Sequence, residues 1–216
     1  MAPPETSTTP APRGGAGPTV ALVSLLVLLL AGAGALGYRE WVVIPREMKE
    51  RAQEAAFQFD PVRRPLAAPA FLGTTPDGKA VTVADARGQV LFVNFWATWC
   101  PPCREEMPSM LQLARELTAR HPGKFRMVAV SVDEGWPEVE KFFGGRLPPG
   151  IDVVLDPEQK ATRDYYCSVR GGCPDSYKFP ETYIVDASGR LVNYVVGPRD
   201  WSDPAAARFL ERLIAQ

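Results

Sequence analysis

NFWATWCPPCREEMPSM, residues 94–110, contains two cysteines that are separated by two prolines. It starts inside a near-continuous apolar run, residues 89–96, and such a run is typical of a strand covered on both faces of a parallel sheet. Residues 101–120 follow with apolar side chains at helical spacing, which predicts a helix. Cys100 and Cys103 therefore lie where a buried strand passes into a helix.

The segments around this stretch alternate between strand and helix patterns. Further strands are predicted over residues 125–133 and 151–156, and helices over 136–143 and 157–166. Turn residues predict two hairpins, around Asp77–Gly78 and around Ser188–Gly189, and a closing helix with Asp203 as N-cap and Pro204 at its first position. The order predicts an α/β fold, with a mixed central sheet flanked by helices on both faces.

The position of the cysteines favours redox chemistry. A helix N-terminus offers free N–H groups and a positive dipole end, and both stabilise a thiolate at Cys100. Such positions lower a thiol pKa from about 8.5 to roughly 3.5–7.5. The thiolate is the attacking species in exchange, and Cys103, one turn further on, is placed to resolve the mixed disulfide. The pair predicts thiol–disulfide exchange.

Composition and spacing exclude several other functions. Lys plus Arg number 24 and Asp plus Glu 25, so no nucleic-acid partner is expected. The only histidine, His121, argues against His-based metal sites and against Ser-His or Cys-His catalysis. Covalent haem needs His after the second cysteine, where Arg104 stands. Zinc would need Cys167 and Cys173 as further ligands, so we expect no metal and no cofactor.

The N-terminal third divides into three segments. Residues 1–18 are rich in Pro, Ala, Thr and Gly and predict a disordered tail. Residues 19–38 carry no charge and predict a transmembrane anchor, a cleaved signal peptide being the alternative. Residues 39–69 predict a linker and stalk, with a short helix over 45–59, and the folded domain is expected over 70–216.

Charges near the apolar segment conflict with the redox chemistry. Lys and Arg are in excess on the cytoplasmic side of a membrane span. Only Arg13 precedes the segment, while four basic residues follow it: Arg39, Arg46, Lys49 and Arg51. The charge rule alone would thus place the domain inside the cytoplasm. Because disulfides persist in oxidising compartments, we expect residues 39–216 outside it.

Residues 92–110, FVNFWATWCPPCREEMPSM, resemble the active site of membrane-anchored thioredoxin-like proteins of the TlpA/ResA/CcmG group. The similarity spans about residues 70–216. It implies a thioredoxin fold with an added N-terminal hairpin and a central insertion. It also implies a single-pass protein of the bacterial inner membrane with its catalytic domain in the periplasm. The usual direction is reduction, with a membrane electron donor and disulfide-bearing clients, apocytochrome c among them.

The resemblance assigns roles to individual residues. Trp99 matches the aromatic residue before the nucleophile, with a plain core aromatic as the alternative. Glu106 matches an acid that handles protons near the cysteines, with a solvated surface acid as the alternative. KFPETYIVD, residues 178–186, resembles the loop opposite the cysteines, so Pro180 is the expected cis proline and Phe179 is expected to offer its backbone to a client strand.

The chain departs from the pattern twice. Asn94 stands where thioredoxins have a buried Asp, so a proton-handling role must move, and Glu106 is the candidate. Residues 165–179 form an inserted loop with Cys167 and Cys173, which suits a structural disulfide. A redox relay and a pair of free thiols are the alternatives.

Other functions remain in competition at this point. The same cysteines could act as an oxidase, although Pro-Pro without His lacks the added thiolate stabilisation of strong oxidants. A peroxiredoxin-like antioxidant would need Thr three residues before its cysteine, where Ala97 stands. A copper or assembly factor for a respiratory oxidase would use the thiols for Cu(I), but no Met/His cluster accompanies them.

Overall fold

The computed structural model describes residues 18–43, 48, 57, 59–170, 172–173 and 176–216. Residues 1–17 of the predicted tail over 1–18, and most of the predicted stalk helix over 45–59, lie outside the described residues, while residue 18 begins a helix. The chain divides into two units, residues 1–51 and residues 52–216. Each is described by itself.

The first unit contains helix α1 (Pro18–Tyr38), followed by a short π-helix, η1 (Arg39–Val43). Side chains of α1 are described from Leu22 onward, and its leucines and valines from there to Leu36 are exposed. Over the described residues, no helix is both long and apolar enough to cross a membrane. The anchor over residues 19–38 stays a prediction.

A single mixed sheet forms the centre of the second unit, and its described strands run in the order β1-β8-β7-β4-β5-β6-β2-β3. β4, β5 and β6 are parallel to one another, and every other pairing is antiparallel. The strands are β1 (Asp60–Ala67), β2 (Phe71–Thr74), β3 (Ala80–Thr82), β4 (Val90–Trp96), β5 (Phe125–Ser131), β6 (Asp152–Leu155), β7 (Glu181–Val185) and β8 (Arg190–Val196).

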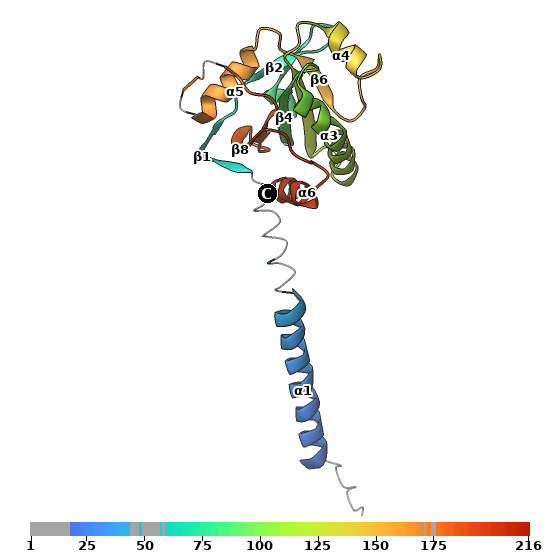
Figure 1. The fold of residues 1–216 in the computed structure, drawn as a ribbon. Coiled ribbons are helices and arrows are strands. Elements are labelled where there is room, and N and C mark those ends of the chain that lie inside the picture. The colour runs from blue at the N-terminus through green and yellow to red at the C-terminus, as the bar shows by residue number, and fades with distance from the viewer. Residues whose placement is uncertain (1–17, 44–47, 49–56, 58, 171, 174–175) are drawn as a thin grey trace, which may run out of the picture. The chain divides into compact units, whose positions relative to one another are not determined.

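Helices cover both faces of this sheet, as the sequence predicts. They are η2 (Val83–Ala86), α3 (Pro101–Arg120), α4 (Trp136–Phe142), α5 (Lys160–Arg170) and α6 (Pro204–Ile214). α3 and α6 share one core cluster, and α5 packs into another on the other side of the central strands (Figure 1). All seven residues of β4 are buried, because apolar side chains cover both of its faces.

The predicted local signals are confirmed. Gly78 and Gly189 adopt φ angles of 80° and 84° in the β2–β3 and β7–β8 turns, a region that glycine enters without strain. The Asp203 carboxylate accepts the Ala205 N–H at 2.8 Å and so caps α6. α4 and β6 form the central insertion, between β5 and α5.

The predicted linker over residues 60–69 is wrong. Those residues contain β1, which pairs with β8 from Asp60–Tyr194 to Ala67–Arg190 and lies at the edge of the sheet. Prolines at 61 and 65 suggested an unpaired chain, but an edge strand tolerates proline because one of its sides has no ladder partner. Phe57 is also buried, with its ring 5.2 Å from Trp201, so the folded unit begins well before residue 70.

The inserted loop is also shorter than predicted. α5 continues to Arg170, so Cys167 lies in the last turn of a helix rather than in a loop. The helix starts after Asp156, whose carboxylate accepts the N–H groups of Lys160 and Thr162 at 2.9 Å each. Val169 is partly buried against the same core cluster as Tyr165 and Tyr166, so the apolar face of the helix continues past the predicted end at residue 166.

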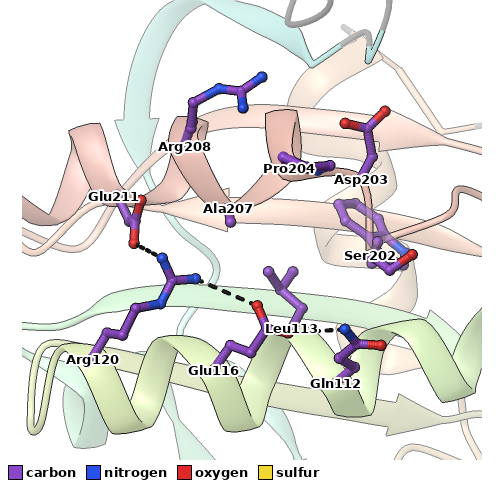
Figure 2. Close-up of a pocket in the computed structure, with 11 residues that line it drawn as sticks. Gln112, Leu113, Glu116, Arg120, Ser202, Asp203, Pro204, Ala207, Arg208 and Glu211 are labelled. Atoms are coloured by element: carbon purple, nitrogen blue, oxygen red, sulfur yellow. Dashed lines mark hydrogen bonds and ion pairs between the residues drawn. The ribbon is translucent and has the colours of Figure 1, made fainter.

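A surface hollow of about 390 Å³ lies between α3 and α6 (Figure 2). Arg120 bridges the two helices there, since its guanidinium contacts Glu116 of α3 at 3.5 Å and Glu211 of α6. The hollow lies along the second half of α3, whereas the cysteines stand at its start. The Arg120 charge in the hollow thus joins the two helices, and the cysteine pair lies at the other end of α3.

Candidate active site

Cys100 and Cys103 are joined by a disulfide at the start of α3. Cys100 is the N-cap residue, and its sulfur accepts the N–H of Cys103 at 3.3 Å. Pro101 and Pro102 have no N–H, so the N–H of Cys103 is the first in the helix that can reach this sulfur. Cys100 retains 5% exposure and Cys103 none, so an attacking group approaches through Cys100.

Glu106 lies one turn after Cys103 and is buried, so the alternative of a solvated surface acid is wrong. Three N–H groups point at its carboxylate. The Asn94 amide donates to Oε1 at 2.9 Å, and the Trp201 indole and the Arg199 backbone donate to Oε2 at 3.1 Å each. Burial outweighs these donors and raises the pKa of Glu106 to about 7. The group can therefore take up or release a proton near neutral pH.

Asn94 suits either protonation state of Glu106. Its Nδ2 also donates to Thr182 Oγ1 at 3.0 Å, while its Oδ1 has no hydrogen-bond partner among the described residues. If the amide turns over, Oδ1 can accept from a protonated Glu106 and from the Thr182 hydroxyl, which both donates and accepts. An Asp at this position would instead add a second buried charge.

A surface hollow gives Glu106 a route to solvent. It has a volume of about 460 Å³ and is lined by Glu105, Glu106, Pro108, Ser109, Pro198, Arg199 and Asp200. Glu105 is exposed, as predicted, while Glu106 forms part of the wall. Protons can therefore pass between the buried carboxyl and water without crossing the cysteine pair.

The loop before β7 carries the predicted cis proline, since the Phe179–Pro180 bond is cis. Trp99 is 61% exposed, so it is not a core aromatic, and its ring meets the Phe179 ring edge-on with centroids 6.0 Å apart. Among the described residues, no backbone group pairs with the N–H or C=O of Phe179. The exposed Trp99 and the half-buried Phe179, whose backbone groups have no backbone partner among the described residues, thus lie beside the cysteine pair.

Cys167 and Cys173 form a second disulfide at the C-terminal end of α5. Cys167 is half-buried and Cys173 is exposed. The geometry excludes the alternative of free thiols in this structure, and it leaves the structural and relay roles as predictions.

Three partners of the site were absent from the sequence prediction: Trp201, Thr182 and the backbone N–H of Arg199. All three are supplied by segments 88 to 95 residues away along the chain from the groups they contact. No local pattern around Cys100 points to them. The one signal was Trp201 itself, a tryptophan placed just before the cap of the last helix.

Comparison with known proteins agrees with this geometry. Residues 65–210 match the Redoxin family. Thiol-disulfide oxidoreductase ResA of Bacillus thuringiensis is 28% identical over 177 residues, which cover 80% of this chain and 85% of the relative. ResA of Geobacillus thermodenitrificans is 32% identical over 133 residues, covering 60% and 67%.

A solved structure shows the same fold. The thiol:disulfide interchange protein of the thioredoxin family from Chlorobium tepidum superimposes with a TM-score of 0.52 at 35% identity, over 70% of this chain and 97% of that one. The match over residues 65–210 covers more than half of the chain and contains both cysteines of the first pair. The chain therefore belongs to the Redoxin family and is a thiol–disulfide oxidoreductase with a thioredoxin fold.

Proposed function

We propose that this enzyme reduces disulfides of client proteins outside the cytoplasm, through Cys100 and Cys103. The observation that carries the proposal is the placement of the pair. The Cys100 sulfur caps α3, and Cys103 is buried one turn before Glu106. Burial of the Glu106 carboxyl raises its pKa to about 7. The first sulfur is placed to attack, and the second to resolve with the help of a nearby base.

The reaction starts from the reduced dithiol. The Cys100 thiolate attacks one client sulfur, the client S–S bond breaks, and the released client thiolate takes a proton. Cys103 then gives its proton to ionised Glu106 and attacks the Cys100 sulfur. The second client thiol leaves and the Cys100–Cys103 bond forms. Two electrons pass to the client, and a membrane thiol donor must return two to the enzyme for the next cycle.

Client binding is assigned to Trp99, Phe179 and Pro180. An extended client segment can pair with the free N–H and C=O of Phe179, as in strand addition. The Trp99 and Phe179 rings would then flank the client disulfide.

The proposed clients are precursors of c-type cytochromes, whose Cys-x-x-Cys-His segment must be reduced before haem attaches. The Pro180-Glu181-Thr182 sequence supports this through its resemblance to the branch dedicated to cytochrome c maturation. The uncharged stretch over residues 19–38 supports attachment to the bacterial inner membrane. The proposed periplasmic side rests on the redox pair, because disulfides persist in oxidising compartments.

A trapping experiment tests the chemistry. Cys103→Ser should accumulate mixed disulfides between Cys100 and clients, because resolution is blocked. Trapping by Cys100→Ser instead would reverse the roles, and trapping by neither would remove the proposal.

A second experiment tests the location. A reporter that is active only after export, fused after Gln216, should be active in intact cells. An inactive fusion would place the domain in the cytoplasm, in line with the basic residues that follow the apolar stretch.

A further inference from the structure

A polar cluster lies beneath the loop that carries Pro180. Glu181, the residue after the cis proline, is 1% exposed, and both of its carboxylate oxygens are engaged. Arg170 donates to Oε1, and the Tyr183 hydroxyl donates to Oε2 at 2.6 Å. Arg170 also reaches the Tyr183 hydroxyl at 3.4 Å. The buried carboxylate is thus held by the last residue of α5.

The other flank of the loop is held by the same helix. The Tyr166 hydroxyl accepts the N–H of Lys178 at 3.0 Å and donates to the Lys178 carbonyl. The Arg170 guanidinium lies over the Tyr166 ring, 4.4 Å from its centre. Residues four apart share one helix face. Tyr166 and Arg170 therefore grip the loop on the two sides of Phe179–Pro180.

The second disulfide lies in this same turn. Cys167 follows Tyr166 and precedes Arg170 by three residues, and its bond to Cys173 ties the end of α5 to the chain beyond it. The last turn of a helix has carbonyl groups without intrahelical partners and frays readily. A covalent tie at Cys167 restrains that fraying, and so holds Tyr166 and Arg170 where they meet the loop.

We propose that Tyr166 and Arg170 are positioning residues for the client-binding loop, and that the Cys167–Cys173 bond raises client affinity by fixing the turn that carries them. This inference rests on the proposed function. In it the second disulfide exchanges no electrons with the first. Its effect is mechanical, through the backbone of Lys178 and the side chain of Glu181.

The test compares a substrate that needs the loop with one that does not. The first is a synthetic peptide with an oxidised Cys-x-x-Cys-His segment, and the second is glutathione disulfide. The full chain is compared with Tyr166→Phe and with the double variant Cys167→Ser/Cys173→Ser. Arg163→Gln is the matched control, because Arg163 is exposed on the same helix and outside the cluster.

Both test variants should raise KM for the peptide about tenfold, the loss expected from one or two hydrogen bonds. The kcat for the peptide and the rate with glutathione disulfide should change by less than about twofold, as should every constant of Arg163→Gln. A general loss of structure would instead lower the reaction rates with both substrates together, and that result would contradict the inference. An unchanged peptide KM in the folded Tyr166→Phe variant would also overturn it.

The result also separates this inference from the proposed function. If Cys100→Ser still turns over the peptide, the proposed function fails. If Cys100→Ser is inactive while the peptide KM is unchanged in both test variants, only the positioning role fails.

Discussion

The two disulfides of this enzyme sit at opposite ends of their helices. Cys100 caps the N-terminus of α3, where the dipole and the Cys103 N–H favour a thiolate. Cys167 lies in the last turn of α5, where the negative end of the dipole disfavours one. The first pair also adjoins a carboxyl whose pKa is raised to about 7.

From this difference we expect the surroundings of a Cys–Cys bond, more than its presence, to decide whether the bond exchanges. A thiolate is needed both to attack and to leave. At the start of α3 the Cys103 N–H can stabilise the thiolate of Cys100, and Glu106 can accept a thiol proton. Arg170, three residues after Cys167, is engaged in an ion pair with Glu181.

The largest expected effect separates the two pairs by activity. Cys100→Ser or Cys103→Ser should lower steady-state client reduction by about 10³-fold or more, since each removes a sulfur from the exchange. Cys167→Ser/Cys173→Ser should keep kcat within about twofold. Measured turnover of an oxidised peptide checks both. If removal of the second pair also abolished turnover, the relay role would replace the structural one.

Removing the acid should have the next largest effect. Glu106→Gln keeps the shape of the side chain but cannot accept the Cys103 proton, so resolution should slow about 10²-fold. The pH–rate profile should lose its inflection near pH 7. Stopped-flow decay of the mixed disulfide across pH measures this. A variant that keeps the wild-type profile would show that another group takes the proton.

The same variant tests a pH dependence of stability. The folded-state pKa of Glu106 is raised from 4.5 to about 7, so the folded protein binds this proton more tightly than the unfolded chain. Stability from this group is present below pH 4.5 and is lost as the pH rises through about 7. The loss should approach about 3 kcal/mol. Urea unfolding at pH 5 and pH 8 should show it in the wild type and not in Glu106→Gln.

Loss of the second disulfide should cost stability. The closed loop is short, so the chain-entropy gain from the Cys167–Cys173 bond is about 2 kcal/mol. Urea unfolding of Cys167→Ser/Cys173→Ser against the parent measures it. An unchanged midpoint would mean that the bond does not stabilise the fold, and the structural role would be lost with it.

The smallest effect concerns Trp201. Trp201→Phe keeps most of the ring against Phe57 and Phe92 but removes the N–H that Glu106 accepts at 3.1 Å. With one donor fewer, the pKa of Glu106 should rise further, by about one unit. The pH–rate profile should move upward with it. A downward shift or no shift would show that the indole does not stabilise the ionised carboxyl.

The sequence could predict what local patterns determine. The strand over residues 89–96, the helix from Pro101, the β7–β8 hairpin and the cap at Asp203 all follow from neighbours in the chain. The cis proline followed from the resemblance of its loop.

Contacts between residues far apart in the chain could not be predicted from local sequence patterns. The prolines of β1 predict a linker, because proline fits a strand only at a sheet edge and the sequence does not show that β1 lies at one. The burial of Glu106 depends on Trp201, 95 residues away. Arg170 and Glu181 meet because the end of α5 lies beside the start of β7, which no spacing along the chain indicates.

We infer that only the bond at the start of α3 carries electrons, and that it does so as a reductant. Redox titration of the full chain, with peptide mapping of both cysteine pairs at each potential, tests it most directly. The account predicts that Cys100–Cys103 titrates below about −200 mV and that Cys167–Cys173 stays oxidised where the first pair is already reduced. A Cys100–Cys103 midpoint near about −120 mV, or two pairs that open and close together, would contradict it.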